Sequence, residues 1–210
     1  MPADFNRMAL LTQRRHSLIL GALALVLFIL GNHQEAAIGF DSRFVMFANE
    51  MMRHGPGFFP TTYGQPYADY SATSTVLTWL LSLPFGQVTS LTAWLPTAVA
   101  SATIVTLMCR LIAPQSSTWA LVSVALLLLS MTFVTETRAV SLDQMLAAVS
   151  FSAFYLAYSH EHFGAPRRHF LLLALLVLGF AIRGPIGLVI PTGILCSFYL
   201  LNGQWRRLIS

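Results

Sequence analysis

The chain has 210 residues, of which 56% are hydrophobic and only 10% are charged. Soluble domains carry about 25% charged residues, and several apolar runs here approach the ~20 helical residues that cross a bilayer. The composition therefore excludes a single soluble core and predicts an all-α, multi-pass membrane protein. The twelve basic residues are all Arg and are scattered along the chain, so the net charge of +4 does not indicate nucleic-acid binding.

Six membrane-spanning helices are predicted within one transmembrane domain that covers residues 1–210. Their predicted bounds are 17–31, 91–112, 118–134, 142–158, 170–182 and 185–201. Several are short for a bilayer, so they must extend into flanking polar residues or stop below the surface. The first run follows Arg14 and Arg15 like a signal peptide, but no clear cleavage motif follows it, which favours an uncleaved anchor.

The arginines predict that the N-terminus is cytoplasmic. Eight arginines fall in the segments that this topology places inside, and four fall outside. The outer four are Arg43, Arg53, Arg138 and Arg183. Because basic residues concentrate on the cytoplasmic side, the long loop from residue 32 to residue 90 is expected to be external.

This external loop is predicted to carry two short interfacial helices joined by a Tyr/Gly/Pro-rich segment. The first begins near Asp41, has an apolar side, and is ended by His54-Gly55-Pro56. The second covers residues 76–83, which is too short to span a membrane, and Pro84-Phe85-Gly86 stops it. Such helices can lie in the membrane interface with their apolar faces down.

Asp41 and Arg43 are the first candidate site residues. Asp41 can be an N-cap, a general base for an acceptor hydroxyl or amine, or both. Arg43 can pair with a lipid phosphate through its planar fork of donors, or it can simply extend to the interface.

Asp69 follows in "YGQPYADYS", among Tyr63, Tyr67 and Tyr70. Aromatic faces can stack on sugar rings, and a carboxylate can hold a hard divalent ion. The alternative is a solvated turn acid.

Three further candidates lie at the predicted outer ends of later spans. Arg138 and Asp143 bracket the start of the span at 142–158, where interfacial anchoring is the alternative role. Arg183 lies between two apolar runs and precedes Gly184-Pro185. An Arg placed at membrane depth is a functional candidate, and the free N–H groups of a helix that starts at Pro185 favour an anion nearby.

Four motifs occur in order along the chain: "FDSRFVMFANEM", "YGQPYADY", "RAVSLDQML" and "AIRGPIGLVIP". Together they resemble the N-terminal part of the bacterial polyprenyl-phosphate-dependent glycosyltransferases of the GT-C fold. That family includes the lipid A aminoarabinose transferases and the protein O-mannosyltransferase-like enzymes. The resemblance covers the chain from about Ser17 to its end.

The resemblance implies roles for residues of the external loop. Asp41 falls on the second of two acidic positions that supply the catalytic acid, and Phe40 occupies the first. Arg43 matches the family's Arg. Asp69 matches an acid that the family links to a divalent metal, which makes a divalent ion the implied cofactor. Tyr70 stands where the family has a phosphate-binding Lys.

The later motifs complete the implied site. Asp143 matches a second family acid, so Asp41 and Asp143 are the implied catalytic residues. Arg183 matches the donor-phosphate contact, which Arg43 and Arg138 are expected to assist. Tyr63, Tyr67 and Tyr70 are expected to line the sugar or the acceptor.

The sequence thus predicts a bacterial inner-membrane glycosyltransferase with a periplasmic active site. It would transfer a sugar from a polyprenyl-phosphate donor to a lipid, glycan or protein. Family members are usually at least twice this length, so a missing C-terminal region or a partner chain is expected to complete the enzyme. The alternative is a non-catalytic membrane protein. A scaffold subunit would show no convergence of the candidate residues, whereas a small transporter would carry ionisable residues near the bilayer midplane and show broken helices.

Overall fold

The structure is a computed structural model. It describes residues 2–32, 40–67, 69–164, 166 and 169–204, except for the side chains of residues 2–14, 32, 40 and 41. Nine α-helices, one 3-10 helix and one two-stranded hairpin lie in this described part. The all-α class predicted from the sequence is therefore confirmed.

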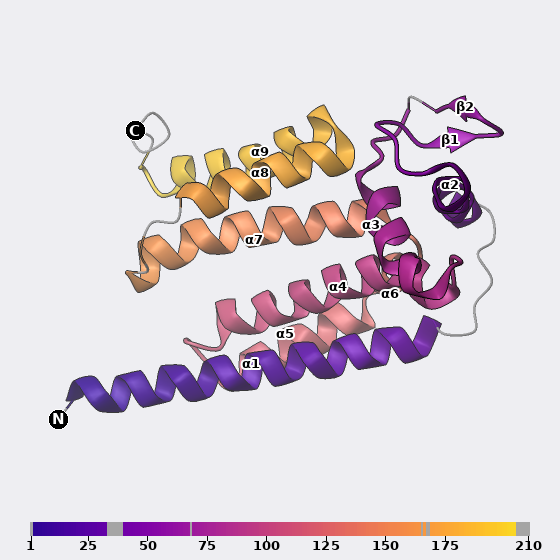
Figure 1. The fold of residues 1–210 in the computed structure, drawn as a ribbon. Coiled ribbons are helices and arrows are strands. Elements are labelled where there is room, and N and C mark those ends of the chain that lie inside the picture. Colours follow the sequence, from indigo (N-terminus) through magenta and orange to yellow (C-terminus); the bar gives the residue numbers. More distant parts are fainter. Residues whose placement is uncertain (1, 33–39, 68, 165, 167–168, 205–210) are drawn as a thin grey trace.

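Five helices run side by side as a bundle (Figure 1). They are α1 (Pro2–Asn32), α4 (Ser90–Ile112), α7 (Leu142–Phe163), α8 (His169–Arg183) and α9 (Pro185–Leu201). These helices contain five of the six predicted spans, and α4 packs between α1 and α7. The first turn of α1 and the last turn of α9 lie at the same end of the bundle (Figure 1).

The predicted external loop folds over the opposite end of the bundle (Figure 1). It contains α2 (Phe40–His54), β1 (Thr61–Thr62), β2 (Gln65–Pro66), α3 (Thr73–Ser82) and the 3-10 helix η1 (Leu83–Phe85). Helix α2 ends where predicted, because Gly55 follows with a φ of 87° that suits glycine. Gly86, with a φ of 67°, likewise ends η1.

The predicted span at 118–134 is wrong as a single helix. Helix α5 (Ser117–Leu129) stops one residue before Ser130, and α6 (Met131–Thr137) leaves at an angle of 68°. Ser130 has an extended conformation, with φ −67° and ψ 120°. Serine favours helix caps and turns over helix interiors, and this preference interrupts an otherwise apolar run.

Among the described residues, fewer helices than the predicted six are long and apolar enough to span a membrane. Among the described residues, Ser90–Ile112 is long and apolar enough to cross a membrane, and the bent α5–α6 pair qualifies if the two helices count as one span. The apolar stretches Arg15–Gly31, Thr73–Phe85, His169–Arg183 and Pro185–Leu201 are shorter. Single helices cover five of the six predicted positions, whereas six complete crossings stay a prediction.

A buried polar network fixes the end of the bundle that the predicted external loop covers. The Gln144 side-chain amide donates to Ser101 Oγ at 2.8 Å, and Ser101 Oγ lies 3.0 Å from Thr137 Oγ1. The Ser141 amide donates to Thr97 Oγ1 at 3.2 Å. Because buried polar groups are costly without partners, this network ties the segment between α6 and α7 to α4.

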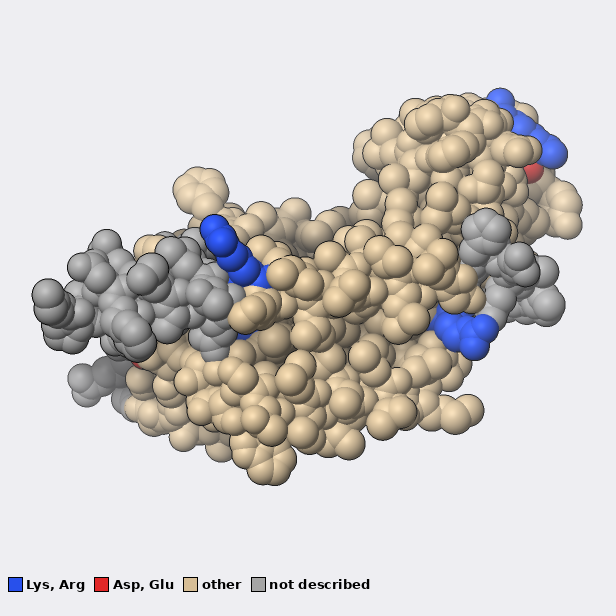
Figure 2. Space-filling model, turned by 90° about the horizontal axis from the view of Figure 1, so that it is seen from below, with Lys and Arg blue, Asp and Glu red and all other residues tan. Residues whose placement is uncertain are grey.

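The outer surface of the bundle is largely apolar. On the face seen in Figure 2, charged side chains of the described residues appear only toward the two ends. Large exposed side chains of α1 include Leu23, Leu27 and Leu30. Large exposed apolar surfaces mark interaction sites. The expected surrounding of this surface is a lipid bilayer.

Candidate functional site

Helix α2 and the segment after β2 form an aromatic cluster around Arg43. The Arg43 Nη1 atom donates to the Tyr67 hydroxyl at 3.2 Å, and its guanidinium carbon lies 5.8 Å from the Tyr67 ring centroid. The Tyr67 and Tyr70 rings are stacked, with centroids 5.9 Å apart and planes 8° apart. Phe44 meets Tyr70 edge-on at 5.4 Å. The structure therefore brings together three of the predicted site residues, Arg43, Tyr67 and Tyr70.

Tyr63 lies outside this cluster, and its role at the sugar or acceptor stays a prediction. It forms the turn of the β1–β2 hairpin with Gly64, has a φ of 51°, and is 86% exposed. A two-residue turn with both residues at positive φ matches the twist of a hairpin. Tyr63 is thus held at an exposed tip, which sequence spacing alone could not distinguish from the positions of Tyr67 and Tyr70.

Ser71 connects the aromatic cluster to the end of α8. Its hydroxyl donates to the carbonyl of Ala181, and it also lies 3.1 Å from Thr73 Oγ1. Ala181 is two residues before Arg183. The chain segment that carries Tyr70 is therefore adjacent to the turn that carries Arg183.

Asp143 and Arg183 form an ion pair. Arg183 Nη2 lies 3.3 Å from Asp143 Oδ1, and the two side chains are 29% and 65% exposed respectively. Asp143 is in the first turn of α7 and Arg183 is the last residue of α8, so the helix dipoles favour both charges. This ion pair uses one nitrogen of a guanidinium that carries five N–H donors, which leaves Arg183 able to bind a second anion.

A close approach of two glycines sets the position of Arg183. A Cβ atom added at Gly187 would lie 1.8 Å from the carbonyl oxygen of Gly179, and one added at Gly179 would lie 2.3 Å from that of Gly187. Helices α8 and α9 are therefore in backbone contact one turn from their connection. Gly184, with φ 62°, and Pro185 at the first position of α9 make that connection tight.

Gly187→Ala is therefore expected to destabilise the protein by about 1–3 kcal/mol, the usual cost of overpacking. The backbone of Gly179 cannot move aside as a flexible side chain would. Thermal unfolding in detergent, followed by loss of helical circular dichroism, measures the effect. Gly193→Ala is the matched control in the same helix, since nothing lies within 4 Å of its added Cβ; equal unfolding temperatures for the two variants would contradict the close packing.

Arg138 occupies the connection between α6 and α7. Its carbonyl accepts a 2.9 Å hydrogen bond from Trp94 Nε1, and its side chain is exposed. Glu136, which the sequence did not single out, accepts a hydrogen bond from the Ser141 hydroxyl. The backbone at Arg138 is thus fixed near the first turns of α4, and its role at the donor phosphate stays a prediction.

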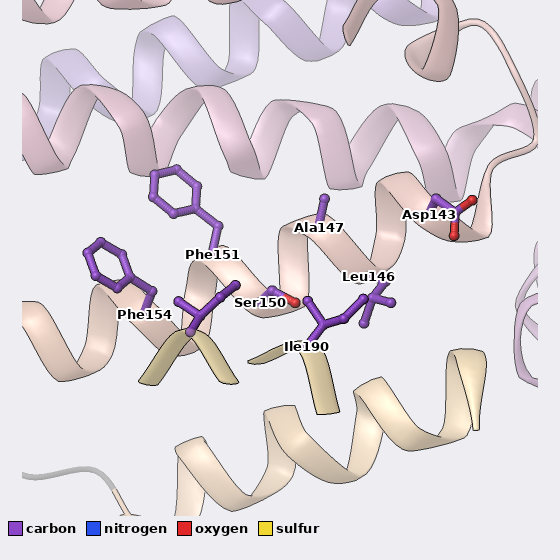
Figure 3. A pocket seen from close by; sticks show the side chains of 8 residues that line it. Asp143, Leu146, Ala147, Ser150, Phe151, Phe154 and Ile190 are labelled. Atoms are coloured by element: carbon purple, nitrogen blue, oxygen red, sulfur yellow. The ribbon is translucent and has the colours of Figure 1, made fainter. Parts of the chain in front are cut away.

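An apolar groove of about 600 Å³ runs between α7 and α9 from the Asp143 position. Figure 3 shows Asp143 at one end of the groove and Phe154 at the other. Its remaining lining residues are Leu146, Ala147, Ser150, Phe151, Ile190 and Ile194. The groove joins a charged mouth to an apolar channel, a combination that suits an anionic lipid. No sequence pattern predicts this groove, because its lining residues resemble those of any apolar helix face.

The structure does not test the predicted roles of Asp41 and Asp69. Asp41 lies in the first turn of α2 rather than at its N-cap, and its side chain is outside the described part of the structure. Asp69 is exposed. Within the described residues, no three His, Cys, Asp or Glu side chains form a group that could hold a metal ion. The role of Asp69 at a divalent ion stays a prediction.

Comparisons with known proteins give a family and a fold. A family model described as dolichyl-phosphate-mannose-protein mannosyltransferase matches residues 73–210. The structure is similar to the crystal structure of ArnT from Cupriavidus metallidurans bound to undecaprenyl phosphate, with a TM-score of 0.77 and 18% sequence identity. The match covers 89% of this chain but 36% of that one, so the chain spans about a third of ArnT. No curated protein matches the sequence.

Proposed function

Because the chain belongs to the dolichyl-phosphate-mannose-protein mannosyltransferase family, we propose that it is a membrane glycosyltransferase module that binds a polyprenyl-phosphate sugar. The family match covers about two thirds of the chain and supports a transferase. We place the module in a bacterial inner membrane, with its N-terminus in the cytoplasm and its site on the periplasmic face. The sugar would pass to a lipid, glycan or protein acceptor.

The observation that carries this proposal is the groove with Arg183 at its mouth. A polyprenyl-phosphate joins one anionic group to a long apolar chain. Arginine pairs with phosphate through charge-assisted hydrogen bonds. The apolar groove between α7 and α9 can bind the hydrocarbon chain of the lipid. The neighbouring Asp143 holds the guanidinium of Arg183 in place, so Asp143 acts on the donor through Arg183 in this account.

The aromatic cluster provides the surface for the sugar. Tyr67 and Tyr70 stack on each other beside Arg43, and Ser71 ties this segment to the turn before Arg183. A sugar attached to a phosphate at Arg183 would therefore face the Tyr67–Tyr70 segment. Asp41 is the proposed general base for the acceptor, and Arg43 and Arg138 are proposed to assist in neutralising the leaving phosphate.

A transporter or scaffold is less well supported by this arrangement. A scaffold requires no convergence of polar side chains, yet Asp143 pairs with Arg183 and Arg43 contacts Tyr67. A transporter is expected to carry its ionisable groups near the bilayer midplane, whereas these groups lie at helix ends.

Filling the groove tests the proposal. Ala147 is exposed and lines the groove, so Ala147→Trp should reduce binding of undecaprenyl phosphate to the detergent-purified protein at least about tenfold, because the indole occupies space that the chain needs. Ala125→Trp, at an exposed position of α5 outside the groove, is the control. Unchanged binding by a folded Ala147→Trp variant would exclude the groove as the lipid site.

A further inference from the structure

The size of the groove limits how much of a lipid it can hold. An apolar cavity of about 150 Å³ holds one benzene molecule, whereas this groove measures about 600 Å³. It therefore has room for about four groups of the size of benzene. An isoprene unit, with five carbon atoms, is close to that size.

The length of the groove is limited as well. Asp143 and Phe154 lie eleven residues apart on α7, which corresponds to ~16 Å of helix. At the inner end the Phe154 ring meets Phe198 of α9 edge-on, with centroids 5.5 Å apart. Tyr158 follows one turn later, 5.9 Å from Phe154. These rings close the groove well before α7 ends at Phe163.

The side wall of the groove is open. Ala147, Ile190 and Ile194 line it and are all exposed. A chain longer than the groove can therefore leave sideways, toward the surrounding lipid, without forcing α7 and α9 apart.

We propose that the site recognises the phosphate and about the first four isoprene units of its lipid, and that the rest of the chain lies in the bilayer. This inference rests on the proposed function. It makes the protein selective for a minimum length of isoprenoid phosphate and indifferent to further length. Carbons within the groove contribute dispersion contacts with its wall, while carbons outside meet an environment equivalent to bulk lipid.

Displacement of radiolabelled undecaprenyl phosphate from the purified protein tests this inference. The competitors are isoprenyl phosphates of two, four and eleven units, each at the same mole fraction in detergent micelles. The four-unit and eleven-unit phosphates should displace the label within about threefold of each other, and the two-unit phosphate should be at least about tenfold weaker, because it leaves half of the wall without contacts. Affinity that keeps rising more than tenfold from four to eleven units would overturn the inference.

A shortened groove provides the second test. Ile194→Trp fills the inner half of the groove and should make the two-unit and four-unit phosphates nearly equal competitors. Leu188→Trp, at an exposed position of α9 outside the groove, should leave the length preference unchanged, and an identical preference in both variants would count against the inference. Absence of undecaprenyl phosphate binding by the folded wild-type protein would instead overturn the proposed function itself.

Discussion

Arg183→Ala is expected to weaken binding of undecaprenyl phosphate by about 10- to 100-fold, because truncating one partner of a hydrogen-bonded charge pair typically costs 2–5 kcal/mol. We discount this cost to about 1.4–2.7 kcal/mol, which corresponds to 10- to 100-fold, since the Arg183 side chain is 29% exposed. The variant also leaves Asp143 without its ion-pair partner, so a negative charge remains at the mouth of the groove. Repulsion between this carboxylate and the lipid phosphate adds to the loss.

Arg53→Ala is the matched control for this substitution. Arg53 is an exposed arginine in the last turn of α2, so its removal changes the net charge equally without touching the groove. A saturation curve with labelled undecaprenyl phosphate measures both variants. If Arg183→Ala and Arg53→Ala bound the lipid equally well, Arg183 would have no specific part in phosphate recognition.

Asp41→Asn is expected to reduce sugar transfer by at least about 100-fold, in line with the 10²–10⁴-fold contribution of a general base. The amide is nearly isosteric with the carboxylate but cannot accept the proton of an acceptor hydroxyl or amine. Binding of undecaprenyl phosphate should stay within about twofold of wild type, because the proposed phosphate contact is Arg183. Transfer of labelled sugar from a polyprenyl-phosphate donor, in membranes that contain the protein, gives the rate.

Glu161→Gln provides the control for Asp41→Asn, since Glu161 lies in the last turns of α7, far along the helix from Asp143. It should transfer sugar at the wild-type rate. A transfer rate for Asp41→Asn that equals this control would remove Asp41 from the mechanism and leave the base unassigned.

The helices were predictable where apolar runs end in residues that stop a helix. His54-Gly55-Pro56 and Gly184-Pro185 mark ends and starts that the structure reproduces within about one residue. The break at Ser130 was not predicted, because one serine is a weak signal within the apolar run of α5 and α6. Only the folded chain shows the change of direction between those helices.

Helix α3 shows a second limit of sequence patterns. Its buried residues are Ser74, Thr75, Thr78 and Ser82, while Leu77 and Leu80 are exposed. Ser82 donates to Thr92 Oγ1 at 2.8 Å, so hydroxyls rather than apolar groups face the bundle. This is the reverse of a soluble amphipathic helix and agrees with the interfacial position proposed for it.

The sequence selects candidate site residues but does not indicate how they are arranged. Asp143 and Arg183 were both selected from the sequence, yet nothing in their forty-residue separation indicates a direct ion pair. That pairing depends on the packing of α8 directly against α7, and α8 in turn contacts α9 at Gly179 and Gly187. The groove also depends on the contact between α8 and α9, because the position of α9 relative to α7 decides which side chains line the groove.

In the proposed function, the groove and Arg183 together bind a lipid through its phosphate. The most direct test compares saturable binding of undecaprenyl phosphate with binding of the neutral alcohol undecaprenol, using wild-type protein in the same detergent. The two lipids have identical chains, so any difference reports the phosphate alone. We expect saturable binding of the phosphate and binding of the alcohol at least about tenfold weaker, as the loss of a charge-assisted pair requires. Equal binding of both lipids, or no saturable binding of either, would contradict this account.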